Sequence, residues 1–332
     1  MILERVCDPS SGLSAVLVVV RPEGLAFGGT RFSATCTESE VVALAQCMEK
    51  KLAGHTAVIG GAKAGFFCSP DDPGLPGLMA LAAEKWGPLL RERVVLGKDM
   101  GASNGLMDGF YAQVGQAQLS PVLGLDVPER LRDFTGYRTY MTGQGVCWSL
   151  SSFFSGSLSG VRVAIQGFGA VGLGAAVRLT RAGAQVLGVS DVDGAYAFSA
   201  APTESELVAM AQGGRCVPGN GGTPLPRERL FSMEVDAVVL AANSHSVSAK
   251  EAESLRAQVL VEGSNFGLCA DARALLGDRQ LPVIPDFIAS SASAAMVALQ
   301  MEARGKLPEA ELWSRVEASI RRQTRALITT GG

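Results

Sequence analysis

Residues 161–174 constrain the fold of this chain more than any other stretch. The apolar run over residues 161–165 predicts a buried strand of a parallel sheet, because both faces of such a strand are covered. Gly167, Gly169 and Gly172 follow on the spacing G-x-G-x-x-G, and a helical apolar pattern begins directly after them. A strand, a glycine turn and a helix in this order are typical of a dinucleotide-binding unit.

Each glycine has an expected role in such a unit. Gly167 permits the tight turn, Gly169 lets the backbone approach a pyrophosphate, and Gly172 lets the helix pack close to the strand. The helix N-terminus adds N–H groups and a partial positive charge that favour phosphate. Asp191 follows the next predicted strand, close to the offset of about 20 residues at which an acidic side chain binds a ribose. We therefore expect NAD rather than NADP; the alternative is a glycine turn without a ligand.

The C-terminal half continues with alternating strands and helices. Apolar runs at residues 235–240 and 258–261 each precede a polar loop, as expected of a parallel α/β sheet that binds ligands at its carboxyl edge. The chain has 332 residues, which exceeds the usual size of one compact core. Apolar residues in the segment 115–133 follow neither the helical nor the strand period. We therefore place a domain boundary there and divide the chain into residues 1–125 and 126–332.

Composition excludes several classes of protein. The net charge is −3 and no basic run occurs, which disfavours nucleic-acid binding. No apolar segment reaches membrane-spanning length and the N-terminus does not resemble a signal peptide, so we expect a cytoplasmic protein. With two histidines and seven scattered cysteines, we expect no metal site and reduced thiols. Lysine and carboxylate groups are the expected agents of any acid–base chemistry.

The N-terminal half carries charged residues within apolar, glycine-containing segments. Residues 12–20 predict the first strand, and the capping-box spacing of Thr37 and Glu40 predicts the start of a helix. Lys63 follows a pair of glycines inside an apolar stretch. Asp99 lies just beyond a short predicted strand, where an acidic side chain is well placed to face a cleft.

Together these motifs resemble the amino-acid dehydrogenases of the glutamate, leucine, phenylalanine and valine group, closest to the leucine, phenylalanine and tryptophan dehydrogenase branch. The resemblance covers most of the chain, in order. The motifs that carry it are residues 28–32, Lys51, residues 60–63, 99–101, 142–146, 167–172, 262–265 and 285–286. It implies an α/β fold with two domains and a cleft between them: an N-terminal α/β domain for substrate binding and oligomerisation, and a Rossmann-type doubly wound dinucleotide-binding domain.

The resemblance also implies a reaction, the oxidative deamination of an amino acid. Lys51 is expected to hold the substrate carboxylate, Lys63, twelve positions on, to be catalytic, and Asp99 to move protons to and from the amine. An exposed lysine has a pKa of about 10.4, but burial beside another cation lowers it into a useful range. A hydride leaves the α-carbon for the nicotinamide, and water activated by Lys63 converts the imine to a 2-oxo acid and ammonia. The alternative for the two lysines is a solvated surface pair.

Further site residues follow from the same resemblance. Substrate contacts are expected at Phe27, Gly29, Met48, Gly97, Ser290, Ala294 and Val297. Cofactor contacts are expected at Thr142, Gly167, Phe168, Gly169, Ala170, Val171, Gly172, Asp191, Val192, Ala241, Ala242, Asn243 and Asn265. The side-chain pocket has no charge to pair a γ-carboxylate, which favours an apolar or aromatic amino acid over glutamate. The expected partners are that amino acid, its 2-oxo acid, ammonia and further copies of the chain, with a dimer favoured.

Departures from the family keep a second interpretation open. Residues 290–293 replace a segment that ends Asn-Ala-Gly-Gly in relatives, where the asparagine helps to hold substrate and nicotinamide; serine has a shorter reach. The chain also stops at Gly332, soon after its last predicted helix, whereas relatives continue. An inactive relative that binds a nucleotide in a regulatory or scaffold role is therefore the alternative. The retained Lys51, Lys63 and Asp99 favour an enzyme.

Overall fold

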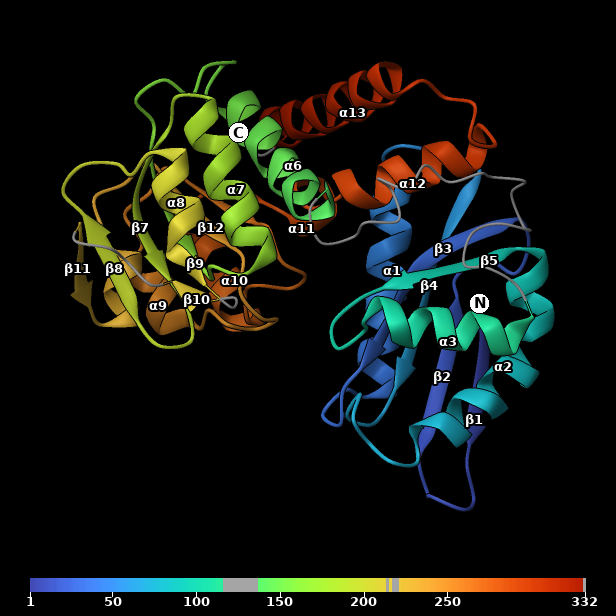
Figure 1. Cartoon of the computed structure of the whole chain (residues 1–332). Helices are drawn as coiled ribbons and strands as arrows, with labels where there is room; N and C mark the ends of the chain where they lie inside the picture. The colour runs from blue at the N-terminus through green and yellow to red at the C-terminus, as the bar shows by residue number, and fades with distance from the viewer. Residues whose placement is uncertain (116–136, 213–214, 217–220, 331–332) are drawn as a thin grey trace. The chain divides into compact units, whose positions relative to one another are not determined.

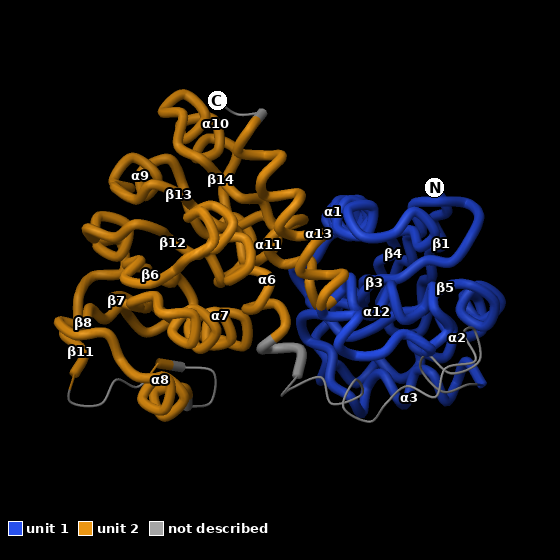
Figure 2. The backbone as a smooth tube through the Cα atoms, turned by 90° about the horizontal axis from the view of Figure 1, so that it is seen from above, with its two compact units in different colours: residues 1–128, 294–313 blue, residues 129–293, 314–332 orange. Residues whose placement is uncertain are grey.

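The computed structural model describes residues 1–115, 137–212, 215–216 and 221–330, and Figure 1 shows its helices and strands. The chain forms two compact units, coloured separately in Figure 2. One comprises Met1–Pro128 with Ala294–Trp313, and the other comprises Glu129–Ser293 with Ser314–Gly332. Residues 294–313 thus belong to the first unit although they follow the second unit's sheet in sequence. The expected boundary between residues 125 and 126 lies outside the described residues.

The first unit is built on a five-stranded sheet with the order β1-β2-β4-β3-β5. Its strands are β1 (Ile2–Cys7), β2 (Ser14–Val19), β3 (Leu25–Phe32), β4 (Ile59–Phe66) and β5 (Val94–Lys98). β2 pairs antiparallel with β1 and β4, and β3 pairs parallel with β4 and β5. The strand predicted at residues 12–20 is confirmed as β2, but it is not the first strand, because β1 precedes it. β1 is an edge strand in which only Val6 is buried. It therefore has no apolar run by which a strand could be recognised in the sequence.

The alternation of side chains gives this sheet two different faces. Its helices are α1 (Glu38–Ala53), α2 (Leu75–Glu92), α3 (Asn104–Val114) and most of α12 (Ala292–Glu302). One face contributes Phe32 and Phe66 to the core that α2 and α3 complete. On the other face α1 packs directly on β4, where a Cβ atom at Gly61 would lie 2.4 Å from the backbone nitrogen of Glu49. The glycine therefore sets how closely α1 approaches the sheet.

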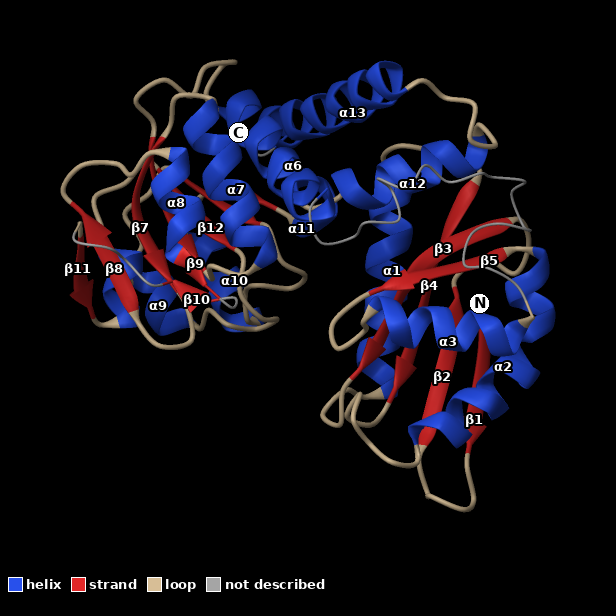
Figure 3. Cartoon of the chain, viewed as in Figure 1, coloured by secondary structure: helices blue, strands red, loops and turns tan. Residues whose placement is uncertain are grey.

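The second unit contains a seven-stranded sheet with the order β11-β8-β7-β6-β12-β13-β14. Figure 3 shows strands of this unit in red. Its strands are β6 (Arg162–Gln166), β7 (Gln185–Ser190), β8 (Ala195–Phe198), β11 (Gly222–Leu225), β12 (Ala237–Leu240), β13 (Val259–Glu262) and β14 (Val283–Ile284), and β9 (Ala211–Gln212) and β10 (Arg215–Cys216) pair separately. The strands from β7 to β14 are parallel neighbours. From β6 the chain continues to β7 on one side of that strand, and it later adds β12 on the opposite side. The direction in which strands are added therefore reverses between β6 and β12. The predicted α/β class with a doubly wound sheet is confirmed.

Glycines also bring the helices of this unit close together. The helices are α6 (Tyr137–Phe153), α7 (Ala170–Arg181), α8 (Glu204–Met210), η1 (Arg227–Ser232), α9 (Ala249–Glu253), α10 (Ala270–Asp278), α11 (Asp286–Ala289) and α13 (Glu309–Thr330), the last beginning in the first unit. A Cβ atom at Gly143 would lie 2.2 Å from the backbone of Gly174 in α7, and one at Gly145 would lie 2.5 Å from the carbonyl of Ala289. The glycines of the 142–146 motif are thus packing residues of α6.

Two kinds of feature are absent from the described part of the chain. None of its helices combines the length and apolar character needed to cross a membrane. The described residues also contain no group of three or more His, Cys, Asp or Glu side chains that could hold a metal ion.

Candidate functional site

The strand register of the first unit brings Lys63, Gly29 and Gly97 into one row. Lys63 in β4 pairs with Gly29 in β3, which pairs in turn with Gly97 in β5. Side chains of directly paired residues point to the same face of a sheet, so the two glycines form a floor beside the lysine. Arg31 lies two residues after Gly29 on the same face, and Asp99 directly follows β5.

Four charged side chains form an ion cluster at the edge of this floor: Lys63, Asp99, Arg31 and Glu40. Lys63 Nζ lies 2.6 Å from Asp99 Oδ2, and Arg31 Nε donates to the same oxygen at 3.0 Å. Arg31 Nη1 also donates to Glu40 Oε1 at 2.5 Å. The side chains of Lys63 and Arg31 are 4% and 6% exposed, against 23% for Asp99. Two residues predicted for the site, Lys63 and Asp99, are therefore in direct contact.

Glu40 belongs to this cluster although the sequence suggested another role for it. Its backbone N–H donates to Thr37 Oγ1 at 3.3 Å, which confirms Thr37 as the N-cap of α1. The capping-box spacing further predicted that the Glu40 carboxylate reaches back to the cap. In the structure that carboxylate pairs with Arg31, because the guanidinium group is a stronger partner than a backbone N–H.

The cluster changes the proton affinity of its members. Burial lowers the pKa of Lys63; the neighbouring Asp99 opposes this effect, and the cations Arg31 and Lys51 add to it. Burial alone would raise the pKa of Asp99, but the Lys63 and Arg31 cations outweigh it and lower that pKa. An ionised carboxylate thus lies beside an amine that releases its proton at a lower pH than an exposed lysine does.

Lys51 lies on α1 and is itself only 7% exposed. Its charge lowers the pKa of Lys63, so the two predicted lysines are electrostatic neighbours. Glu49 fixes this part of α1 to the sheet: Oε2 accepts the Gly61 N–H at 2.5 Å and Oε1 accepts Arg21 Nε at 2.6 Å. The glycine pair before Lys63 thus provides both the space and the hydrogen bond that position the helix.

Gly29 lets the charged groups approach the strand closely, because it has no side chain. A Cβ atom there would lie 3.0 Å from Asp99 Cβ and 3.4 Å from Lys63 Nζ. Phe27, two residues earlier on the same face, is 4% exposed. The other positions predicted for the side-chain pocket also belong to this unit: Gly97 in β5, Met48 in α1, and Ala294 and Val297 in α12.

Ser290, the remaining substrate residue predicted from the sequence, belongs to the second unit. It is buried at the end of α11, and its hydroxyl donates to the Asp286 carbonyl at 2.8 Å. The structure therefore uses the hydroxyl proton within the turn of the Pro285–Asp286 motif.

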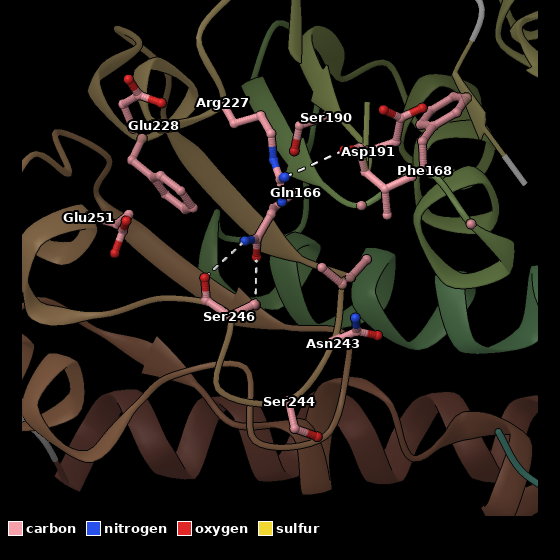
Figure 4. Close-up of a pocket in the computed structure, with 16 residues that line it drawn as sticks. Gln166, Phe168, Ser190, Asp191, Arg227, Glu228, Asn243, Ser244, Ser246 and Glu251 are labelled. Atoms are coloured by element: carbon pink, nitrogen blue, oxygen red, sulfur yellow. Dashed lines mark hydrogen bonds between the residues drawn. The ribbon is translucent and has the colours of Figure 1, made fainter. Parts of the chain in front are cut away.

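A cavity of about 690 Å³ opens at the carboxyl edge of the second unit's sheet (Figure 4). Its wall comes from the loops after β6, β7 and β12, with further residues from η1 and α9. The predicted cofactor residues that line it are Gly167, Phe168, Gly169, Asp191, Val192, Ala241, Ala242 and Asn243. The other predicted cofactor residues lie in α6 (Thr142), in the first turn of α7 (Ala170, Val171, Gly172) and after β13 (Asn265). The cavity thus lies where the strand order reverses, as expected for a ligand site in such a sheet.

The three glycines of the turn differ in what surrounds them. Gly167 has a φ of +89°, which favours glycine, and a Cβ atom there would lie 2.5 Å from the Ala241 carbonyl oxygen. A Cβ atom at Gly172 would lie 1.9 Å from the Gly167 carbonyl oxygen. At Gly169, by contrast, a Cβ atom would meet no described atom within 4 Å. Packing therefore requires two of the glycines, whereas the third has open space in front of it.

The carboxylate of Asp191 is fixed at the cavity wall by backbone groups. Oδ1 accepts the N–H groups of Asp193 and Gly194 at 2.8 and 3.1 Å, and Oδ2 accepts the Cys216 N–H at 2.6 Å. Arg227, exposed on η1, extends beside it and donates to the Val192 carbonyl at 3.5 Å (Figure 4). The carboxylate therefore keeps one orientation at the end of β7.

Sequence reasoning missed several lining residues of the cavity. Gln166 and Ser246 are joined by two hydrogen bonds in Figure 4: Gln166 Nε2 donates to the Ser246 carbonyl at 3.4 Å, and Ser246 Oγ donates to Gln166 Oε1 at 3.1 Å. Gln166 is the last residue of β6, so its place before the glycine turn could have identified it. No comparable signal marked Ser246 or Arg227, because each comes from a loop or short helix that reaches the cavity only in the folded chain.

Comparison with known families gives matches to both units. The family model described as "Glutamate/Leucine/Phenylalanine/Valine dehydrogenase" matches residues 135–330. A second model, "Glu/Leu/Phe/Val dehydrogenase, dimerisation domain", matches residues 20–115. Together they cover most of both units.

Curated relatives and solved structures agree with these matches. Glutamate dehydrogenase A2 of Halobacterium salinarum is 32% identical over 280 residues, which is 80% of this chain and 66% of that relative. The NADP-specific glutamate dehydrogenase of Saccharolobus shibatae is 29% identical over 277 residues, 80% of this chain and 64% of that relative, so the chain spans just under two thirds of these proteins. The hetero-hexameric glutamate dehydrogenase from Thermus thermophilus shares the fold at a TM-score of 0.77, with 24% identity over 98% of this chain and 82% of that one. The chain therefore belongs to the glutamate, leucine, phenylalanine and valine dehydrogenase family.

Proposed function

We propose that the protein is an NAD-dependent dehydrogenase that deaminates an apolar or aromatic L-amino acid to its 2-oxo acid and ammonia, reversibly. The observation that carries this proposal is the buried contact of Lys63 with Asp99 beside the glycine floor at Gly29. Burying charge costs free energy, and a protein that only binds a nucleotide gains nothing from a buried amine of lowered pKa.

The proposed roles follow the chemistry of each group. Neutral Lys63 takes a proton from the water that attacks the substrate imine, and its lowered pKa makes the neutral form available. Asp99, ionised and in contact with Lys63, moves protons to and from the substrate nitrogen. Lys51 pairs with the α-carboxylate of the substrate. Gly29 has no side chain, which lets Asp99 and Lys63 approach each other closely beside the strand.

The proposed substrate class rests on the uncharged positions around the floor. Phe27 stands on the same face as Lys63, and Gly97 belongs to the same row. A γ-carboxylate buried against these residues lacks a cationic partner and costs several kcal/mol. The curated relatives named above are glutamate dehydrogenases, so the proposal includes a change of substrate relative to them.

The cavity of the second unit fits a nicotinamide dinucleotide. Its volume of about 690 Å³ is within the usual range for small-molecule sites. The open space at Gly169 and the N-terminus of α7, a 12-residue helix, suit the pyrophosphate, and the fixed Asp191 carboxylate suits the ribose hydroxyls. When bound, the cofactor supplies the hydride acceptor. We favour NAD because the Asp191 carboxylate repels a 2′-phosphate, although relatives include both NAD-specific and NADP-specific enzymes.

We also propose that the protein assembles into a homo-oligomer, with a dimer favoured. The model that matches residues 20–115 is described as a dimerisation domain, and the enzyme from Thermus thermophilus is described as hetero-hexameric. Light scattering after size-exclusion chromatography measures the subunit number directly. A monomeric mass at micromolar concentration would contradict the proposal.

Reduction of the cofactor tests the function. The purified protein is mixed with NAD or NADP and with leucine, valine, phenylalanine, tryptophan or glutamate, and absorbance of the reduced cofactor is followed. We expect an apolar or aromatic amino acid with NAD to give the highest rate. The rate should rise with pH, because Lys63 must lose its proton and does so below its ordinary pKa of 10.5. No reduction with any amino acid, while calorimetry shows that NAD binds, would instead support a non-catalytic, nucleotide-binding role.

A further inference from the structure

We propose that Arg31 is a positioning residue for the proposed deamination: anchored on Glu40, it holds Asp99 through Oδ2 so that Oδ1 is the oxygen available to the substrate nitrogen. The inference rests on the proposed function for its chemistry. Its evidence is the geometry of the ion cluster, in which Arg31 contacts Asp99 and Glu40 at the same time.

The two cations of the cluster approach the same carboxylate oxygen. Lys63 Nζ is 2.6 Å and Arg31 Nε is 3.0 Å from Asp99 Oδ2. Within the part of the chain that the structure describes, no hydrogen bond reaches Oδ1 of Asp99. The Asp99 side chain retains 23% exposure, whereas both cations are almost fully buried. One oxygen is thus committed to the protein, and the other remains for a ligand.

Arg31 fixes this orientation because it is itself held at two points. Nε binds Asp99 after β5, and Nη1 binds Glu40 in the first turn of α1. The planar guanidinium group cannot rotate while both contacts are made. Lysine at this position has a single nitrogen and cannot keep the same two-point geometry. The backbone adds a third restraint, since the Asp99 N–H donates to the Thr30 carbonyl at 3.0 Å.

Arg31 also sets the charge balance around the proposed base. The charged and titratable groups that act on this cluster are Lys63, Lys51, Asp99, Arg31, Glu40 and Cys36. Burial, with the Glu40 carboxylate, raises the pKa of the Cys36 thiol to about 11, so the thiol adds no negative charge near neutral pH. The Arg31 cation lowers the pKa of Lys63 and that of Asp99. Loss of its charge therefore raises both pKa values, and Lys63 keeps its proton to higher pH.

Three variants separate position from charge. Arg31→Gln removes both contacts and the charge; Arg31→Lys keeps the charge but not the two-point hold. Arg5→Gln is the matched control, because Arg5 pairs with Glu38 and so also links a strand to the first turn of α1, but at an exposed site. We expect Arg31→Gln to lower kcat by up to about a hundredfold, as a small misplacement of a reacting group does, and to move the pH limb of kcat/KM upward. Arg31→Lys should keep the pH dependence of kcat/KM of the unaltered protein but show the lowered kcat. Arg5→Gln should change neither quantity.

A second measurement does not depend on activity. NMR of protein labelled with ¹³C at the lysine ε-carbons follows the titration of Lys63, whose signal is identified by its loss in Lys63→Met. We expect the pKa of Lys63 to rise in Arg31→Gln and not in Arg5→Gln. If no amino acid is oxidised by the unaltered protein, the proposed function fails while this titration still tests the role of Arg31. An unchanged Lys63 titration, or an unchanged kcat and pH limb with only a lower Tm, would show that Arg31 is merely structural.

Discussion

The ion cluster of the first unit and the cavity of the second are built from different kinds of group. In the cluster, charged side chains contact one another above a floor of glycines, and two of them, Lys63 and Arg31, are almost fully buried. In the cavity, the glycine turn lies beside polar and charged side chains, and the carboxylate of Asp191 is held by backbone donors. In the cluster, charged side chains hold one another, whereas in the cavity backbone N–H groups hold the charge of Asp191.

Because of this difference, we expect substitutions in the two regions to have different measurable effects. In the proposed function the cluster transfers protons, so substitutions in the cluster should act on kcat and on pH dependence. Oriented backbone groups bind without titrating, so substitutions in the cavity should act on cofactor affinity. A cluster variant that altered only binding, or a cavity variant that altered only kcat, would break this division.

The largest expected effect comes from removal of the proposed base. Lys63→Met should lower kcat by about 10²- to 10⁴-fold, the usual contribution of a general acid or base, and leave NAD affinity unchanged. Lys50→Met is the control, because Lys50 is exposed on α1. Steady-state kinetics and calorimetric NAD binding provide the two measurements. A kcat within tenfold of the unaltered protein would show that Lys63 is not the base.

Gly29→Ala should have the next largest effect, because its methyl group enters the space between Asp99 and Lys63. We expect kcat/KM to fall about a hundredfold, since displacement of reacting groups by about 1 Å has that cost. Gly109→Ala is the control: it lies in α3, where an added Cβ meets no described atom within 4 Å. Full activity in Gly29→Ala would mean that the substrate binds elsewhere.

More of the glycine turn than of the ion cluster could be predicted from local sequence patterns. The glycine turn was predictable with its strand and helix because all three are adjacent in the chain, so local patterns suffice. Lys63 and Asp99 were identified by the family resemblance, and the register of β3, β4 and β5 brings them together. Arg31 was missed although it belongs to a quoted motif. Its contact with Asp99 spans 68 positions and depends on a strand order that periodicity does not reveal.

The same limit applies to the cavity. Asp191 was found by its offset from the glycine turn, but the backbone N–H of Cys216 that holds it comes from a separate small sheet. The Ser246 hydrogen bond to Gln166 joins residues 80 positions apart. Tertiary partners of this kind follow from the folded arrangement, and no spacing rule encodes them.

Asp191→Asn should have a moderate effect on the cavity alone. Loss of the charge weakens the contact with the ribose hydroxyls, so NAD affinity should fall roughly tenfold, which corresponds to about 1.4 kcal/mol. NADP affinity should stay constant or rise, because the repulsion of a 2′-phosphate is removed. Asp193→Asn, at an exposed neighbouring position, is the control. Calorimetric titration with each cofactor checks the prediction, and an equal loss for both cofactors would indicate damage to the loop instead.

Arg227→Gln should have the smallest effect and tests the division most sharply. Arg227 is a charged residue of the cavity wall, but it is exposed, and interactions of exposed charges contribute only about 0.2–1 kcal/mol and are screened by salt. We expect NADP affinity to fall less than about fivefold at low ionic strength, the difference to vanish at high ionic strength, and NAD affinity to stay constant. The effects of Arg31→Gln should persist at high salt, because that guanidinium group is buried. If Arg227→Gln instead weakened NADP binding strongly at every salt concentration, the cavity would also depend on a desolvated side-chain charge. The two regions would then bind by the same kind of interaction and differ only in where it occurs.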